Sequence, residues 1–344
     1  MTKKFDVVIG NPPYQEEAQG GGTRDTPLYH LFMDAAYEVG KKVVLITPAR
    51  FLFNAGLTPK AWNEMMRAER RLTVPHYVPT SGALFPGTDI KGGIAVTYWD
   101  EDADAEPIGT FTKYPELNTI LHKVLGSTFQ SLEDLITTSR SFRYTAKLYE
   151  DHPDLLDLRP KGNQFLVESN AFDEFGEVFL PEKSADGNEY VRVLGLSDRE
   201  RVFRWIRRDY FDGPENLWKY KVALPKANGS GQFGEVLASP TVIEPGVGTT
   251  HTFITIGAMD DLGSATACLN FIKTKFGRTM LGVAKITQDN KRHTWRYVPN
   301  QDFTASSDIV WTKSIAEIDK DLYVKYGLDA DEVAFIEENV KPMN

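Results

Sequence analysis

The sequence predicts an α/β domain with a mainly parallel sheet, followed by a second, mixed α+β domain. Apolar, β-branched runs alternate with stretches of helical spacing over the first hundred residues, which is the pattern of a parallel sheet. From about residue 110 the chain carries many short strand-like runs separated by Gly, Pro and Asn turns. The 344 residues are enough for two separate cores.

The first domain divides into strands and helices in chain order. Gly and Pro residues bound short apolar strands, and apolar residues at helical spacing mark the helices. The predicted strands are 7–9, 43–46 and 92–99, and the predicted helices are 29–37 and 59–71, each preceded or opened by a proline.

An acidic stretch at residues 100–106 ends the first domain, which we place at residues 1–107. The second domain covers residues 108–310, with helical patterns at 115–125 and 264–275. Residues 311–344 form a C-terminal segment, and the apolar spacing predicts two amphipathic helices at 313–326 and 330–340.

Composition limits the kind of protein. The chain is 41% hydrophobic and 25% charged, as in ordinary globular proteins, and it has no run of about 18 apolar residues, so we expect no membrane span. Its single cysteine, Cys268, excludes an internal disulfide and predicts a small buried residue in a protein of the reducing cytoplasm. The six histidines lack ligand spacing, so we expect no metal site.

The net charge of −9 argues weakly against a protein coated for nucleic acid, but a DNA-binding face needs only local positive charge. Basic residues interleave with aromatic residues in two stretches of the second domain. Three of these arginines are expected on neighbouring helical turns, where they suit phosphate contacts; the alternative is a solvated helix face paired with nearby carboxylates. The candidates are Arg204, Arg207, Arg208, Lys219, Lys221, Lys226, Arg292 and Arg296.

The most specific feature is the turn Asn11-Pro12-Pro13-Tyr14, directly after the first strand. The Asn11 side-chain oxygen and the Pro12 carbonyl are acceptors, and two prolines remove donors and fix φ. An exocyclic amino group has two protons for two such acceptors, and these bonds return its nitrogen lone pair to a nucleophilic state. Tyr14 can stack on the aromatic base that carries such an amino group. A plain Pro-Pro turn after a strand is the alternative.

Residues 6–14 resemble motif IV of the S-adenosylmethionine-dependent DNA methyltransferases that act on amino groups. Residues 43–51 look like the next strand-and-turn motif of their gamma group, and residues 83–98 resemble the motif whose aromatic residue, here Phe85, stacks on the flipped adenine. The tail at 326–337 is similar to the C-termini of restriction-modification adenine methylases. For Phe85 the alternative is a core aromatic residue.

This resemblance implies a partial Rossmann-like methyltransferase sheet followed by an α+β target-recognition domain. It implies site-specific N6-methylation of adenine in double-stranded DNA as part of a restriction-modification system, with base flipping and S-adenosylmethionine as methyl donor. The catalytic residues would be Asn11, Pro12, Pro13, Tyr14 and Phe85, and the basic residues after residue 140 would bind DNA.

Gamma-group enzymes carry their Gly-rich cofactor motif before motif IV, but only ten residues precede Asn11. We therefore expect S-adenosylmethionine to bind mainly outside this chain. The cofactor half could be a separate protein partner, the gene could be truncated and its product inactive, or the chain could be a fragment. Each predicts an exposed apolar sheet edge at Val7–Ile9 unless a partner covers it.

Three rival functions remain. A protein-glutamine methyltransferase uses the same turn but has no large domain after the catalytic sheet, and N4-cytosine methylation is scarcely excluded. A non-catalytic DNA-binding or specificity subunit is the rival of another class. Two further loops carry weaker signals: Gly20–Arg24 could cradle phosphate but lacks the Lys-Ser/Thr of a P-loop, and Arg50 could reach phosphate or pair with a carboxylate.

Overall fold

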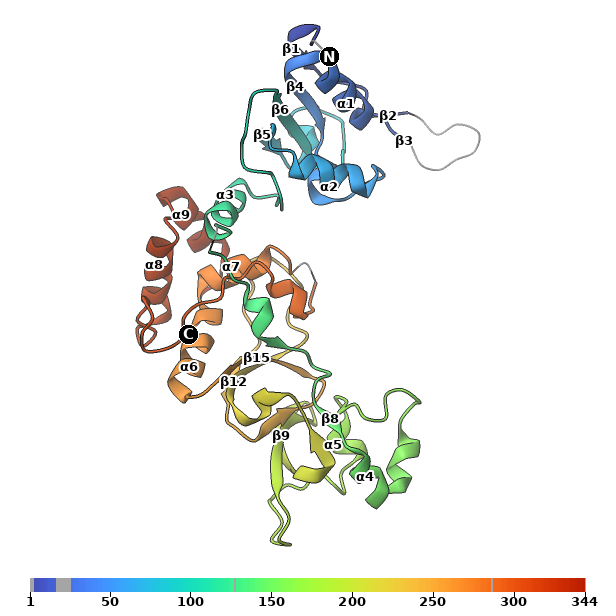
Figure 1. Cartoon of the computed structure of the whole chain (residues 1–344), viewed down its shortest axis with the longest axis vertical. Coiled ribbons are helices and arrows are strands. Elements are labelled where there is room, and N and C mark those ends of the chain that lie inside the picture. Colours follow the sequence, from blue (N-terminus) through green and yellow to red (C-terminus); the bar gives the residue numbers. More distant parts are fainter. Residues whose placement is uncertain (1–2, 17–25, 127, 286, 344) are drawn as a thin grey trace. The chain divides into compact units, whose positions relative to one another are not determined.

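The computed structural model describes residues 3–16, 26–126, 128–285 and 287–343, which belong to two compact units, Met1–Asn118 and Thr119–Asn344 (Figure 1). The sequence placed this boundary at residue 107. Residues 108–118 group with the first unit because Ile108 is buried in its core and the ring of Phe111 packs against Phe53 and Tyr77.

The first unit is built on a four-stranded sheet in the order β1-β4-β6-β5. Its strands are β1 (Phe5–Gly10), β4 (Gly40–Pro48), β6 (Ile94–Asp100) and β5 (Leu72–Val78). β1 and β4 are parallel, whereas β6 runs antiparallel to both β4 and β5. The prediction of a mainly parallel sheet is therefore wrong. The segment between β5 and β6 contains the short 3-10 helix η2 (Ser81–Ala83) and no longer helix. It therefore lacks the crossover helix that a parallel pair of strands usually needs.

Both predicted helices of this unit are confirmed. The helix α1 (Tyr29–Val39) joins β1 to β4, and after the 3-10 helix η1 (Ala49–Phe53) comes α2 (Lys60–Ala68). Side chains from these helices and from β4 and β6 form one core. The strands β2 (Gln15–Glu16) and β3 (Thr26–Pro27) pair as a short antiparallel ribbon beside α1.

The outer strand β1 leaves one apolar face uncovered within its unit. Among the described strands β1 pairs with β4 alone, and Phe5, Val7 and Ile9 are 55%, 53% and 77% exposed. These side chains alternate along the strand and so project from the same face, while Val8 packs toward the core. The expected exposed apolar edge at Val7–Ile9 is confirmed in the described structure.

The described residues of the second unit form three sheets. β9 (Tyr190–Ser197) lies between β10 (Glu200–Arg207) and β14 (Val247–Thr249), and β8 (Arg143–Tyr144) pairs with β11 (Phe211–Asp212). The four-stranded sheet has the order β13-β12-β15-β7, with β13 (Thr241–Ile243), β12 (Tyr220–Pro225), β15 (Phe253–Met259) and β7 (Ile136–Thr137).

The helices of the second unit include all four that the sequence predicted after residue 107. They are α3 (Pro115–Val124), which begins before the unit boundary, α6 (Leu262–Lys273), α8 (Ile315–Lys325) and α9 (Ala330–Asn339). The others are α4 (Ala146–Asp151), α5 (Ala171–Glu174) and α7 (Lys275–Gly282), with 3-10 turns η3 (Leu132–Leu135), η4 (Pro153–Leu158), η5 (Arg208–Tyr210), η6 (Glu215–Trp218) and η7 (Arg292–Trp295).

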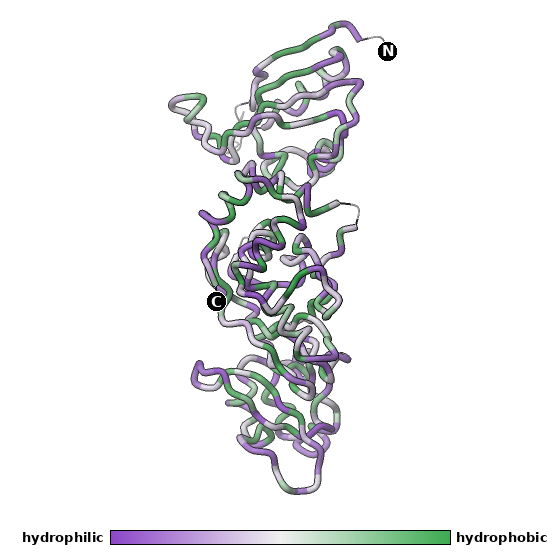
Figure 2. Tube along the Cα trace, turned by 90° about the vertical axis from the view of Figure 1, so that its left-hand side faces the viewer, coloured by the Kyte–Doolittle hydropathy of each residue, from purple (hydrophilic) through white to green (hydrophobic). Residues whose placement is uncertain are grey.

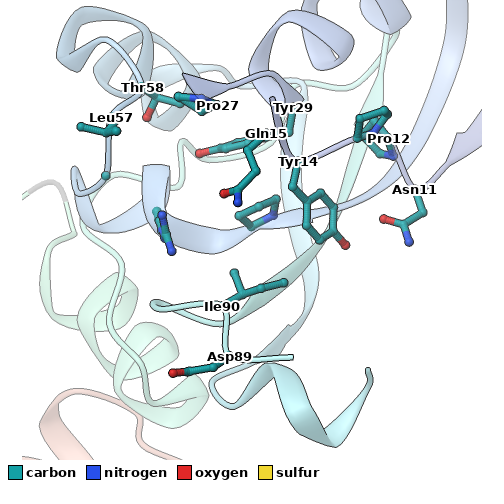
Figure 3. Close-up of a pocket in the computed structure, with 14 residues that line it drawn as sticks. Asn11, Pro12, Tyr14, Gln15, Pro27, Tyr29, Leu57, Thr58, Asp89 and Ile90 are labelled. Carbon is teal, nitrogen blue, oxygen red and sulfur yellow. The ribbon is translucent and has the colours of Figure 1, made fainter. Parts of the chain in front are cut away.

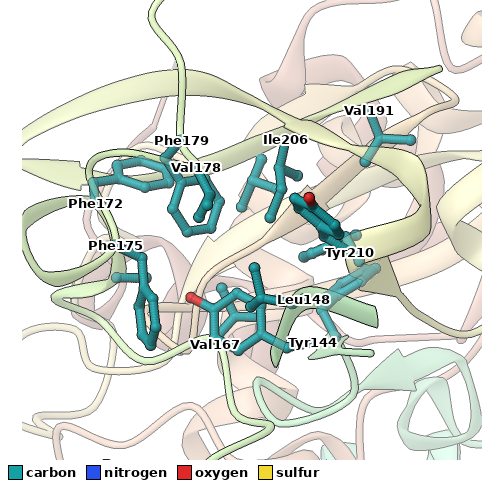
Figure 4. Close-up of a cluster of buried hydrophobic side chains, with 14 of the residues drawn as sticks. Tyr144, Leu148, Val167, Phe172, Phe175, Val178, Phe179, Val191, Ile206 and Tyr210 are labelled. Carbon is teal, nitrogen blue, oxygen red and sulfur yellow. The ribbon is translucent and has the colours of Figure 1, made fainter. Parts of the chain in front are cut away.

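An aromatic core holds β8–β11 and their flanking helices together. Phe172, Phe175, Phe179 and Tyr144 turn toward one interior, with ring centroids of adjacent pairs 4.9 to 6.2 Å apart (Figure 4). Apolar segments recur along the trace of both units between hydrophilic connections (Figure 2). Cys268 is fully buried in α6, as the sequence predicted.

The C-terminal helices are integrated into the second unit, although the sequence set residues 311–344 apart. Asp319 of α8 accepts hydrogen bonds from the backbone N–H groups of Lys275 and Phe276 at the start of α7. The buried Arg278 of α7 donates to the carbonyl of Lys341 beyond α9. Within the described residues, no helix is long and apolar enough to span a membrane.

Candidate active site

The turn Asn11-Pro12-Pro13-Tyr14 lies at the carboxyl end of β1, next to the carboxyl end of the parallel strand β4. Its last residue is anchored, because the Tyr14 carbonyl accepts hydrogen bonds from the N–H groups of Leu28 and Tyr29 at the start of α1. The turn is therefore fixed between β1 and α1, where a sheet of parallel strands commonly places a ligand.

All four residues of this turn line a cavity of about 550 Å³, a size typical of small-molecule sites. Pro48 and Arg50 after β4, Leu57 and Thr58 before α2, and Asp89 and Ile90 before β6 contribute to its wall. Figure 3 shows Asn11 and Tyr14 at one side, with Asp89 and Ile90 across from Tyr14. The cavity lies entirely within the first unit.

The turn presents acceptors to the cavity. Neither proline has a backbone N–H, so the Asn11 side-chain oxygen and the peptide carbonyls have no donor from Pro12 or Pro13 beside them. The Tyr14 hydroxyl is buried and makes no hydrogen bond of normal geometry with the described residues. Burial raises the pKa of Tyr14, and the nearby Asn11 side chain opposes that shift. Tyr14 therefore stays a neutral phenol at physiological pH.

An aromatic cluster supports the inner wall. Tyr29 is 3% exposed and its ring packs edge-on against Trp62 at 6.3 Å, while Trp62 packs against Phe51 at 5.5 Å. The indole N–H of Trp62 donates to Asp34 at 2.9 Å, which fixes the ring. Burial raises the pKa of Tyr29. This support holds the cavity wall independently of any ligand.

Phe85 does not belong to the residues that line the cavity. It is half-buried in the loop that leads to Asp89 and Ile90, and its backbone N–H donates to the Ser81 carbonyl at 2.8 Å. The sequence missed Leu57, Thr58, Asp89 and Ile90 as wall residues, because nothing in their local pattern indicates a site. Gly20–Arg24 lies outside the described residues.

The basic stretch around Arg204 is a strand, so the expectation of neighbouring helical turns is wrong. Arg204 and Arg207 lie in β10, which pairs with β9 along its whole length, and Arg208 begins η5. Val202, Arg204 and Ile206 are two residues apart and therefore share one face of the strand. The spacing of the arginines did not reveal this two-residue period.

The candidate DNA-binding residues differ in how their charge is compensated. Arg207 is paired with Asp209 and lies 3.6 Å from Asp151, Lys219 is paired with Asp260, and Arg292 lies 3.4 Å from Asp134. Within the part of the chain that the structure describes, the five others have no ion pair: Arg204, Arg208, Lys221, Lys226 and Arg296.

Two exposed aromatic residues lie beside arginines of this region, one of them beside Arg192, which is not among the candidates and is paired with Glu244. The guanidinium of Arg208 lies 5.2 Å from the ring centre of Trp218, which is 49% exposed. That of Arg192 lies 5.3 Å from the ring centre of Phe203, which is 42% exposed. Exposed rings beside arginines suit contacts with nucleic acid bases and backbone.

Lys221 departs from the expectation, because it is fully buried in the central strand β12. Its ammonium donates to the carbonyls of Lys219 at 3.0 Å and Glu244 at 3.5 Å. Burial lowers the pKa of Lys221 to about 7. A side chain without solvent contact cannot reach a DNA phosphate, so Lys221 is removed from the candidate interface.

The first part of the chain matches a known protein family. Residues 1–85 match the Eco57I restriction-modification methylase family. This segment contains the Asn-Pro-Pro-Tyr turn and most of the cavity wall, so the resemblance to adenine methylases of restriction-modification systems is confirmed there.

A curated relative supports the same assignment. An uncharacterized adenine-specific methylase from Mycoplasma pneumoniae is 28% identical over 103 residues, which are 29% of this chain and 24% of that protein. The matched region thus spans about a quarter of the curated relative.

Two solved structures align over 97% of the chain at 11% identity. They are the type IIG restriction endonuclease BpuSI, with a TM-score of 0.32 and 52% of its chain covered, and the type IIL restriction-modification enzyme MmeI in complex with DNA, with a TM-score of 0.31 and 56% covered. Scores this low carry no argument about fold or function.

The described residues of the second unit include two Gly-x-Gly sequences, the simplest element of a cofactor loop. In Gly229-Ser230-Gly231 the backbone N–H groups of Ser230 and Gly231 donate to the Glu235 carboxylate. Gly246-Val247-Gly248 enters β14, and a Cβ on Gly248 would lie 2.4 Å from the ring of Phe211. Gly248 therefore serves close packing, and Gly246 a turn with φ of +77°. In the described part of the chain, no cluster of three or more His, Cys, Asp or Glu could hold a metal ion.

Proposed function

We propose that this chain carries the amino-group-binding turn and the DNA-binding unit of a site-specific adenine N6-methyltransferase of a restriction-modification system. The observation that carries the proposal is the placement of Asn11-Pro12-Pro13-Tyr14 in the wall of a cavity of suitable size, within a segment of the matching family. Such an enzyme must extrude its target base, because the amino nitrogen is out of reach inside a duplex.

The chain's own residues would act on the amino group. The Asn11 side-chain oxygen and the Pro12 carbonyl accept the two amino protons and favour a tetrahedral nitrogen, whose lone pair then becomes available. Tyr14 and Phe85 stack on the base; for Phe85 this requires its loop to move toward the cavity. S-adenosylmethionine supplies the electrophilic methyl group in this proposal.

We place the donor mainly outside the described residues, on a protein segment or partner that covers β1. Two features of β1 support this placement. Its outer edge is free of a partner strand among the described residues and so favours the addition of another strand, and its face formed by Phe5, Val7 and Ile9 is uncovered. Calorimetric titration with S-adenosylmethionine tests it. Tight binding by the purified chain alone would contradict it, whereas binding only after the missing component is added supports it.

DNA binding is the part of the proposal that the second unit carries. Arg204, Arg208 and Arg296 lack ion pairs with described residues, and Arg208 and Arg296 also stand beside aromatic rings. If all three contact phosphates, the logarithm of the affinity should fall with the logarithm of salt concentration with a slope of about −3 or steeper. A flat response would remove nucleic acid from the account.

A non-catalytic specificity subunit or an inactive truncated methylase is the alternative. This alternative predicts salt-dependent DNA binding without methyl transfer under any reconstitution. N6-methyladenine formed by a reconstituted complex, detected by mass spectrometry of digested DNA, would eliminate it; N4-methylcytosine instead would reassign the base.

A further inference from the structure

Arg50 is a charged residue of the cavity wall whose role the amino-group chemistry leaves open. It follows the carboxyl end of β4 as the second residue of η1. The N–H of the preceding Ala49 donates to the Gly93 carbonyl at 3.0 Å, and the Arg50 carbonyl accepts from Ala55 at 3.0 Å. The backbone of Arg50 is therefore held on both sides.

The side chain of Arg50 is also held in place. Gly56 and Gly92, with φ of +88° and +87°, approach its aliphatic stem so closely that a Cβ on either would lie 3.1 Å from a stem carbon. At the far end, Nε donates to the Lys91 carbonyl at 2.7 Å. A guanidinium fixed at its stem and at Nε loses little further freedom when a ligand binds.

The charge of this guanidinium is not neutralised by the described residues. The structure gives Nη1 and Nη2 of Arg50 no carboxylate and no hydrogen-bond partner there. Asp89, which also lines the cavity, pairs instead with Lys91 at 2.6 Å. Of the two roles that the sequence left open for Arg50, the carboxylate pair is therefore absent from the described structure.

We propose that Arg50 is a positioning residue that binds an oxyanion of the substrate, namely the phosphodiester next to the nucleotide whose base enters the cavity. The inference rests on the proposed function. A guanidinium with two free terminal nitrogens matches phosphate in a bidentate arrangement, and an extruded nucleotide brings a phosphate on each side.

The carboxylate of the methyl donor is a second source of the same chemistry. The strand order favours the phosphodiester: the uncovered edge on which we place the donor is β1, whereas Arg50 follows β4, the inner neighbour of β1. Asn11 at the end of β1 thus lies on the donor side, and Arg50 on the other.

Small ligands test this without knowledge of the recognition sequence. The full-length chain is titrated by NMR with deoxyadenosine and with its 5′- and 3′-monophosphates. We expect the wild type to bind one monophosphate about tenfold more tightly than the nucleoside, as a charge-assisted contact implies. Arg50→Gln should lose this preference and keep its affinity for deoxyadenosine. Arg50→Lys, which retains an aliphatic stem and the charge, should keep part of it.

Arg70→Gln is the matched control, since Arg70 lies in the same unit, is paired with Asp104 and does not line the cavity; it should behave as wild type. A phosphate preference that survives in Arg50→Gln overturns the inference. The inference is also overturned if Arg50→Gln loses affinity for S-adenosylmethionine, compared with its affinity for 5′-deoxy-5′-methylthioadenosine, and keeps the phosphate preference. In that case Arg50 binds the carboxylate of the methyl donor. A wild type that binds thymidine as well as deoxyadenosine refutes the proposed function itself and the inference with it.

Discussion

Replacing the buried Lys221 with methionine should stabilise the protein at neutral and acidic pH. Lys221 has no solvent contact and no carboxylate partner among the described residues, and burial lowers its pKa from 10.5 to about 7. The folded state therefore binds fewer protons than the unfolded state between about pH 7 and pH 10. Stability must rise with pH over this window and be lost as pH falls.

The shift sets the size of the effect. A pKa shift of this size corresponds to a destabilisation of the folded protein by about 5 kcal/mol at a pH where Lys221 is fully protonated in both the folded and the unfolded state. The two carbonyls that accept hydrogen bonds from Lys221, those of Lys219 and Glu244, favour the charged form and reduce the penalty, so we expect about 2 to 4 kcal/mol. Methionine fills a similar volume without a charge.

The assay is urea unfolding of wild type and Lys221→Met at pH 6 and pH 9. The advantage of the variant should shrink by about 2 kcal/mol at pH 9, because the wild-type lysine is then neutral in the fold. This change with pH is independent of any packing difference between the side chains. Lys219→Met serves as control, because Lys219 is only half-buried and its ammonium is paired with Asp260, and it should show a difference within about 0.5 kcal/mol at both pH values. An advantage that does not change with pH would refute the reasoning, and a loss of DNA affinity would return Lys221 to the interface.

Two further perturbations test the second unit. Burial raises the pKa of Asp319 to about 6, so the folded state binds more protons than the unfolded state between about pH 4 and pH 6. The free energy of unfolding of the wild type should therefore fall by about 2 to 3 kcal/mol relative to Asp319→Asn as pH rises from 4 to 7. Unfolding curves at these pH values check this, and parallel pH dependences of the two proteins would contradict it. Phe211→Ala should cost about 3 to 5 kcal/mol, because Phe211 is fully buried and stacks on Phe142 at 5.8 Å; a loss below about 1 kcal/mol in denaturant unfolding would show that this core is loosely packed.

Local patterns in the sequence were enough to predict the longer helices, but not α4, α5, α7, β5 or the individual strands of the second unit. The helices α1, α2, α6, α8 and α9 follow from apolar spacing, and their ends agree within a few residues. The direction of β6 did not follow, because direction depends on how a connection crosses the sheet and not on the composition of the strand. A 3-10 turn in place of a helix between β5 and β6 reverses the strand.

The site was predictable only where it is contiguous. Asn11 to Tyr14 form one turn whose chemistry can be recognised in four residues. The opposite wall comes from Leu57, Thr58, Asp89 and Ile90, which are brought together only by the sheet. Lys221 was misassigned because a lysine inside the apolar run 220–225 is indistinguishable by type from an exposed one, and its burial comes from strands on both sides of β12.

The exposed edge raises a separate expectation for the isolated chain. Phe5, Val7 and Ile9 present an apolar stripe on an outer strand, which favours association with whatever can cover it. A soluble complex with a cofactor-binding component should protect the β1 amides from hydrogen exchange, whereas the second unit should be unaffected.

The most direct test of the central claim is methyl transfer to DNA by the reconstituted enzyme carrying Asn11→Ala. Loss of the acceptor should lower the formation of N6-methyladenine by about a hundredfold or more, while DNA affinity and its salt dependence stay as in wild type. Asn11→Asp, which keeps an acceptor oxygen, should retain part of the activity. Unchanged turnover in Asn11→Ala would contradict the account, because the turn at the end of β1 would then not hold the amino group.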